Sequence, residues 1–195
     1  MDRHDDTLRE ALRNHRAENG FPPDGGVGET WAPVRVGPIP ICIPNVAARR
    51  RAIPFHDLNH LLTGYGHDDV GEAEIGAFEL GSGCKGFVAA WILNWAALLL
   101  GVGRAPARVF AAFVRGRHTT NLYATDLDTV LDVPVVLVRS SLGLDVEYRG
   151  RLRDLALFSA AVGLAPLVGA IPGIVALLTS PFWLARGAQR VHRAV

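Results

Sequence analysis

The sequence predicts an all-α protein: a compact helical domain with a metal-binding helix pair and apolar helices that associate with a membrane. Three observations lead to this prediction. The 195 residues are 49% hydrophobic and 20% charged, which suits one compact domain and excludes a disordered chain. Two histidines stand four residues apart in a segment with helical periodicity. Residues 86–103 and 155–185 contain no charged side chain.

Charge and cysteine content argue against several function classes. The 20 Lys and Arg balance 19 Asp and Glu, and this net charge of +1 argues against nucleic acid as a partner. Cys42 and Cys84 form no CxxC pair, which argues against a disulfide framework or a cysteine zinc site. Residues 1–20 carry nine charges and no apolar run, so we expect no secretory signal peptide.

We divide the chain into three regions. Residues 1–47 are expected to form a peripheral arm, with a short helix over 5–19 and an extended segment over 34–44 in which prolines alternate with isoleucine and valine. Residues 48–150 are expected to form the helical core. Residues 151–195 are expected to form apolar helices that associate with a membrane.

Two helices joined by a tight turn are predicted at the start of the core. Pro54 is expected early in the first helix, which carries Leu58 and other apolar residues at helical spacing and ends at Gly64. Asp69 is the predicted N-cap of the second helix, and Glu72 completes a capping box. The turn between them contains His67, which we expect to be solvated, as we do His118 further along the chain.

The rest of the core contains three further helix candidates. Residues 86–103 form the first apolar run, and residues 107–114 are amphipathic. A helix is predicted over 126–142; it is weakened by Pro134 and closed at Gly143.

The apolar run over 155–185 would measure about 46 Å as one helix, which exceeds the roughly 30 Å of a hydrocarbon core. Three prolines divide it: Pro166, Pro172 and Pro181. We therefore expect either one kinked span with interfacial ends or a hairpin of two short helices. The run is followed by three arginines and no acidic residue: Arg186, Arg190 and Arg193. This charge pattern favours a cytoplasmic C-terminus.

The phrase HDLNH places His56 and His60 on one helix face, where two imidazoles can bind one cation. Asp57 and Glu72 can add oxygen ligands. Two nitrogens and two oxygens suit zinc, and iron or manganese are compatible with the same ligand types. In the alternative interpretation, Glu72 only caps its helix, His60 is a core histidine bonded to a backbone carbonyl, and Asp57 interacts with the helix dipole.

Residues 56–79, HDLNHLLTGYGHDDVGEAEIGAFE, resemble the Coq-four family of ubiquinone biosynthesis, whose hallmark is H-D-x-x-H, eleven residues and then Glu. The similarity includes Leu58, Gly71 and the Phe78–Glu79 pair, and a second similar segment is LDVPVVLVRSSLGL at 131–144. The resemblance covers roughly residues 50–145. It implies a mostly helical membrane protein that binds isoprenoid lipids and holds zinc through His56, Asp57, His60 and Glu72.

The resemblance also implies a function. The protein would bind a polyprenylated aromatic acid or quinone precursor and promote decarboxylation and oxygenation at C1, a carboxy-lyase-type step on a prenylated hydroxybenzoate with the metal centre as the catalytic group. Trp91 and Trp95 are expected to be core or interface anchors, and with Phe78 they are our candidate lipid-binding residues. We expect the cytoplasmic side of a bacterial inner membrane, with other quinone-biosynthesis enzymes or a second copy of the chain as partners.

Two alternatives remain open at this point. A non-catalytic scaffold would bind the same isoprenoid lipid and use the metal only as a clip between the two motif helices. An HD-type metal phosphohydrolase would instead bind metal through the adjacent His56 and Asp57.

Overall fold

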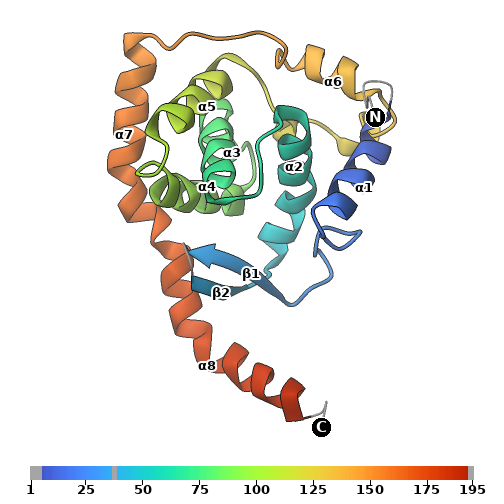
Figure 1. Cartoon of the computed structure of the whole chain (residues 1–195), viewed down its shortest axis with the longest axis vertical. Coiled ribbons are helices and arrows are strands. Elements are labelled where there is room, and N and C mark those ends of the chain that lie inside the picture. The colour runs from blue at the N-terminus through green and yellow to red at the C-terminus, as the bar shows by residue number, and fades with distance from the viewer. Residues whose placement is uncertain (1–5, 37–38, 193–195) are drawn as a thin grey trace.

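The structure is a computed structural model that describes residues 6–36 and 39–192, and these residues are mostly helical. In chain order the elements are α1 (Leu8–Glu18), β1 (Trp31–Val36), β2 (Ile39–Pro44), α2 (Ala47–Thr63), α3 (Asp69–Ser82), α4 (Val88–Gly101), α5 (Pro106–His118), α6 (Val135–Ser141), α7 (Leu152–Gly169) and α8 (Ile171–His192). Helices α3, α4 and α5 lie between α2 on one side and α7 on the other, and the sheet lies at one end beside α8 (Figure 1). The all-α prediction holds for most of the chain and is wrong for the sheet.

Helix α1 belongs to the hydrophobic core. Thr7 and Glu10 form a capping box at its start. Leu8 and Ala11 are fully buried and belong to the same apolar cluster as Leu58 of α2. Of the helix predicted over 5–19, Leu8–Glu18 is confirmed and residue 5 lies outside the described residues; the helix is buried in the core and not peripheral.

The segment expected to be extended forms one strand and part of another in an antiparallel sheet of two strands. The register places Trp31 opposite Pro44. Each strand of a two-stranded sheet has a free edge, where a proline removes no ladder hydrogen bond, so the prolines do not prevent pairing. Ala32 and Ile43 form a small apolar cluster with Ala176, which attaches the sheet to α8.

Helix α2 begins at Ala47, so Pro54 lies inside the helix and not in its first turn. A proline here has no N–H to donate to the carbonyl of Arg50. Arg50 is exposed, so water can bond to that carbonyl. The helix ends as predicted at Gly64, whose φ of 78° is in the left-handed region and whose N–H donates to the carbonyl of His60.

Helix α3 packs against α4 and α5 at very short range. A Cβ on Gly116 of α5 would lie 2.1 Å from the carbonyl oxygen of Phe78. A Cβ on Gly101 of α4 would lie 2.0 Å from the Cβ of Ala73. Only glycine permits backbones to approach this closely. The two neighbouring helices therefore fix the position of α3.

The helix predicted over 126–142 is not continuous. Residues Leu127–Thr129 form one 3-10 turn, and α6 begins only after Pro134, which is its N-cap. Proline disfavours the helical conformation for the residue before it, so the break falls at this point. Gly143, with a φ of 77°, follows the end of α6 as predicted.

The apolar C-terminal run forms one bent segment, and the hairpin alternative is wrong. Helix α8 continues from α7 and passes beside the sheet (Figure 1). By length and composition, Leu152–Phe182 could cross a membrane. Its most exposed large apolar side chains are Leu152, Leu167, Leu177 and Leu178. Arg193 and the side chains of Arg186 and Arg190 lie outside the described part of the chain.

Candidate metal centre

Helix α2 presents two histidines one turn apart on the same face. The Nε2 atoms of His56 and His60 are 3.2 Å apart, and the two rings are perpendicular. Leu58 and Leu62 are fully buried in the core, which fixes the rotation of the helix. Both imidazoles therefore direct their Nε2 atoms to one point, as the i and i+4 spacing predicts.

Glu72 reaches the two histidines from the first turn of α3. Its carboxylate oxygens lie 3.7 Å from Nε2 of His56 and 3.6 Å from Nε2 of His60. One ligand atom from each of the three residues lies within 4.8 Å of the others, a grouping that could hold a metal ion. The structure thus brings together three of the four predicted ligands.

The start of α3 corrects the predicted capping. The N-cap is Asp68, not Asp69, and its side chain accepts a hydrogen bond of 2.7 Å from the N–H of Gly71. The cap is complete without Glu72, whose carboxylate turns to the histidines instead. The capping-box interpretation of Glu72 is therefore wrong.

The other ring nitrogen of each histidine has a fixed partner. Nδ1 of His56 lies 3.2 Å from Oε1 of Glu79, and Nδ1 of His60 lies 3.0 Å from the carbonyl oxygen of Tyr65. Metal-binding histidines usually donate their second nitrogen to a carboxylate or a carbonyl, which fixes the tautomer and the ring orientation. The arrangement of Nδ1 partners thus fits a metal bound at Nε2.

Glu79 is a fully buried carboxylate that sequence reasoning did not select as a site residue. It accepts hydrogen bonds from Asn59 (2.8 Å), Asn94 (2.7 Å) and the Tyr123 hydroxyl (2.9 Å). Burial raises the pKa of Glu79, but His56 and the hydrogen bonds outweigh burial and lower it overall. The available sequence signal was an acidic residue in a mostly apolar helix, seven positions after Glu72.

Protonation at the site is compatible with cation binding. Burial and the neighbouring His56 lower the pKa of His60 to about 3, so this ring is neutral. Burial also lowers the pKa of His56, but Glu79 and Glu72 outweigh it and raise this pKa well above its usual value. Burial raises the pKa of Glu72, and its contacts with His56 and His67 lower it more strongly. A bound cation would replace the His56 proton.

Asp57, the fourth predicted ligand, faces away from this point. Its Oδ2 accepts a hydrogen bond of 2.8 Å from Nε of Arg16 and lies 2.7 Å from Nη2 of the same residue. Asp57 follows His56 by one residue, which turns it about 100° around the helix toward α1. This correction leaves a ligand set of two nitrogens and one carboxylate.

The two histidines expected to be solvated have partners. Nδ1 of His67 is 3.5 Å from Oε1 of Glu72, and its Nε2 is 2.9 Å from Nε2 of His15. His118 stacks on Tyr148. His67 therefore lies beside the candidate centre. The sequence contains no signal of its contact with His15, because the two residues are 52 positions apart.

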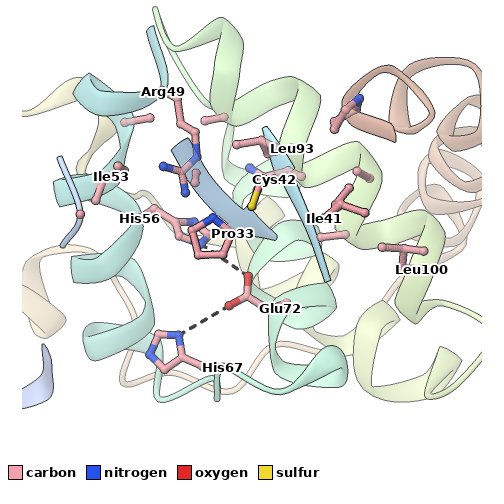
Figure 2. A pocket seen from close by; sticks show the side chains of 18 of the residues that line it. Pro33, Ile41, Cys42, Arg49, Ile53, His56, His67, Glu72, Leu93 and Leu100 are labelled. Carbon is pink, nitrogen blue, oxygen red and sulfur yellow. Dashed lines mark ion pairs between the residues drawn. The ribbon is translucent and has the colours of Figure 1, made fainter. Parts of the chain in front are cut away.

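A cavity of about 1630 Å³ lies next to the centre, and His56 and Glu72 are among its lining residues (Figure 2). Figure 2 shows Glu72 between His56 and His67, with aliphatic side chains of β2 and α4 nearby. The apolar wall includes Ile41, Leu93, Ala97, Leu100, Ile174 and Leu177. The site thus combines a polar end with a long apolar wall.

None of the three candidate lipid-binding residues is among those that line this cavity. Phe78 is 1% exposed within the main core. Trp95 packs against that core, and Trp91 lies partly exposed on the surface of α4. The helical period of α4 directs other residues, such as Leu93 and Ala97, to the cavity.

No protein-family model, curated protein or solved structure matches this chain. The interpretation of the centre therefore rests on its own geometry and on the motif in the sequence.

Proposed function

We propose that this protein binds zinc at His56, His60 and Glu72 and acts on a polyprenylated aromatic acid or quinone precursor, promoting decarboxylation and oxygenation at C1. The carboxylate leaves as carbon dioxide and a hydroxyl takes its place. Because zinc is redox-inert, an external two-electron oxidant such as molecular oxygen takes up the two electrons. The observation that carries this proposal is the ligand set of two imidazoles and one carboxylate beside a large cavity. Catalytic zinc sites use three protein ligands and keep one position open, whereas structural sites use four. The ligand set therefore favours catalysis over a structural clip. Iron or manganese would suit the same donors.

Each part of the site has a separate role in this proposal. Glu79 and the carbonyl of Tyr65 hold the two imidazoles in the orientation that exposes Nε2. A bound zinc ion would supply a Lewis acid that polarises an oxygen of the substrate. The apolar wall of the cavity would take the prenyl chain and exclude water from the polar end.

The C-terminal segment supports a location at the membrane. Helices α7 and α8 expose large apolar side chains, and Leu152–Phe182 is long and apolar enough to cross a membrane, although it is longer than one untilted span needs. We propose the cytoplasmic side of a bacterial inner membrane, where a polyprenyl substrate and other quinone-biosynthesis enzymes would be available.

A scaffold that binds isoprenoid lipid without catalysis is the second candidate. The exposed apolar surface of α7 and α8 favours it, because such a surface can bind partner proteins as well as lipid. An HD-type phosphohydrolase is not proposed, because it needs His56 and Asp57 on one cation and Asp57 is paired with Arg16.

The first experiment is elemental analysis of the purified protein and three variants, His60→Ala, Glu72→Gln and Asp57→Asn. We expect about one zinc per chain in the wild type and in Asp57→Asn, and none in the other two. A folded wild type without metal would contradict the metal centre.

Incubation of the zinc-loaded protein with a prenylated hydroxybenzoate then separates the two candidates. Release of carbon dioxide that is lost in Glu72→Gln supports catalysis. Binding of the prenylated hydroxybenzoate without release of carbon dioxide supports the scaffold. This outcome should hold even when the other substrates of the partner quinone-biosynthesis enzymes are present.

A further inference from the structure

Two buried donors that belong to cavity-lining residues have no acceptor among the residues that the structure describes. They are Nε of Arg49 and the indole Nε1 of Trp31. A third buried nitrogen, Nη2 of Arg16, lies 2.7 Å from the Asp57 carboxylate and so has an ionic partner. Buried donors are almost always paired in native proteins, so these two require an acceptor from outside the chain, either water or a bound group.

The guanidinium of Arg49 is held in a defined place. Its Nη1 donates to Oδ1 of Asn45 at 3.0 Å. Asn45 is 2% exposed and donates in turn to the carbonyls of Gly26 and Glu29. Figure 2 shows the Arg49 side chain extending into the cavity on the side of His56. The free Nε edge is therefore preorganised.

The charge of Arg49 is not neutralised by direct contact. Within the described ranges, no carboxylate forms an ion pair with it; the nearby Asp57 pairs with Arg16 instead. Burial lowers the pKa of Arg49, and the more distant carboxylates of Asp57 and Glu72 only partly oppose this. A half-buried cation without a contacting anion favours binding of one.

The position of Arg49 relates it to the metal centre. Arg49 and His56 lie on the same helix, seven residues apart, which is two turns and about 10 Å along the axis. Trp31 lies opposite Pro44 in the sheet, next to the Asn45 that holds Arg49. Arg49 and Trp31 both line the cavity, and the strand residue opposite Trp31 adjoins the Asn45 that holds Arg49.

We propose that Arg49 and Trp31 form an anion subsite that binds the carboxylate of the substrate acid. The Nε edge of a guanidinium matches a planar carboxylate with two parallel hydrogen bonds, and the indole N–H adds a third. This inference rests on the proposed function for the identity of the acid. It assigns recognition of the acidic group to Arg49, whose side chain extends into the cavity on the side of His56 (Figure 2).

The test compares two probes, 3-geranyl-4-hydroxybenzoic acid and its methyl ester, by calorimetric titration of the full chain in detergent. Zinc-free and zinc-loaded proteins are both titrated. We expect the wild type to bind the acid at least about tenfold more tightly than the ester in both forms, as a charge-assisted hydrogen bond provides. Arg49→Gln should weaken binding of the acid much more than binding of the ester, and so remove most of this preference.

Three further variants make the test specific. Arg50→Gln changes the neighbouring exposed arginine and should keep the full preference. Trp31→Phe removes only the N–H and should lower the preference about threefold. Arg49→Lys keeps the charge without the fork and should also lower it severalfold, so the subsite remains testable if the glutamine variant does not fold.

The outcomes separate this inference from the proposed function. Acid preference that survives in Arg49→Gln and Arg49→Lys overturns the subsite, while binding of both probes leaves the proposed function standing. Acid preference that appears only with zinc also overturns the subsite, because the metal would then be the group that binds the carboxylate. Absence of binding of either probe to the zinc-loaded wild type overturns both proposals.

Discussion

The two sides of α3 are built in opposite ways. Toward α4 and α5 the helix shows small residues, and glycines of the neighbours bring the backbones into contact. Toward α2 it shows two carboxylates, Glu72 and Glu79, which contact His56. Carboxylates facing a neutral interior lower stability unless they are paired, whereas close apolar packing raises it. The packed side therefore supplies the stability and rigidity that the polar side needs.

Breaking the packed side should have the largest effect. We expect Gly116→Ala to lower the free energy of unfolding by about 3 kcal/mol, because the new Cβ would overlap the Phe78 carbonyl. Thermal unfolding followed by circular dichroism measures this loss. Gly103→Ala is the matched control, since nothing lies within 4 Å of its Cβ, and a loss of similar size there would refute the packing argument.

The partner of the polar side, α2, can be tested at Asp57. We expect Asp57→Asn to lower the free energy of unfolding by about 2 kcal/mol, because it removes one charge from a nearly buried pair with Arg16. Zinc content should stay at the wild-type value. Asp132→Asn breaks an exposed pair with Arg9 and should change stability little. Loss of zinc in a folded Asp57→Asn protein would return Asp57 to the ligand set.

Glu79 is the point at which the polar side would support the proposed metal ion. Glu79→Gln keeps the shape of the side chain but weakens its hold on Nδ1 of His56, so we expect zinc affinity to fall roughly 10- to 100-fold. Competition with a chelator measures this affinity. Glu74→Gln lies on the same helix, where Glu74 pairs with Arg108, and should leave zinc affinity unchanged. Equal zinc affinity in both variants would show that Glu79 does not orient the ligand.

The smallest effect is expected at Tyr123. Its hydroxyl is one of three neutral donors to Glu79, so Tyr123→Phe should lower the free energy of unfolding by about 1 kcal/mol. Zinc affinity should change by less than about threefold, since His56 keeps its own contact with Glu79. A tenfold loss would mean that the whole network, and not Glu79 alone, positions the imidazole.

Local patterns predicted the parts of the fold that local forces decide. The end of α2 at Gly64 and the existence of α1 follow from residues within a few positions. The approach of Glu72 to His56 and His60 also followed, because a short turn joins the two helices. The sheet was missed because its prolines predicted an extended segment without strand pairing. In a two-stranded sheet each strand has a free edge, where a proline is tolerated.

Partners distant in sequence decided the rest. Asp57 pairs with Arg16, 41 residues away, and His67 contacts His15, 52 residues away. No spacing rule indicates such contacts. Glu79 illustrates a third case: its position was noticed within the motif, but its role depends on donors from α4 and from the 3-10 turn Leu122–Ala124 that carries Tyr123.

Two residues of α8 have a consequence for how the proposed prenylated substrate would arrive. Ile174 and Leu177 line the cavity, yet they are 54% and 73% exposed, so the apolar wall continues onto the outer surface of the helix. A prenyl chain that slides along this surface from a bilayer avoids water, whose penalty is roughly 0.8 kcal/mol per methylene. The length of the prenyl chain would then strongly change the affinity for a substrate dissolved in water and hardly change the affinity for a substrate already in a membrane. The local lipid composition would therefore set the occupancy of the site.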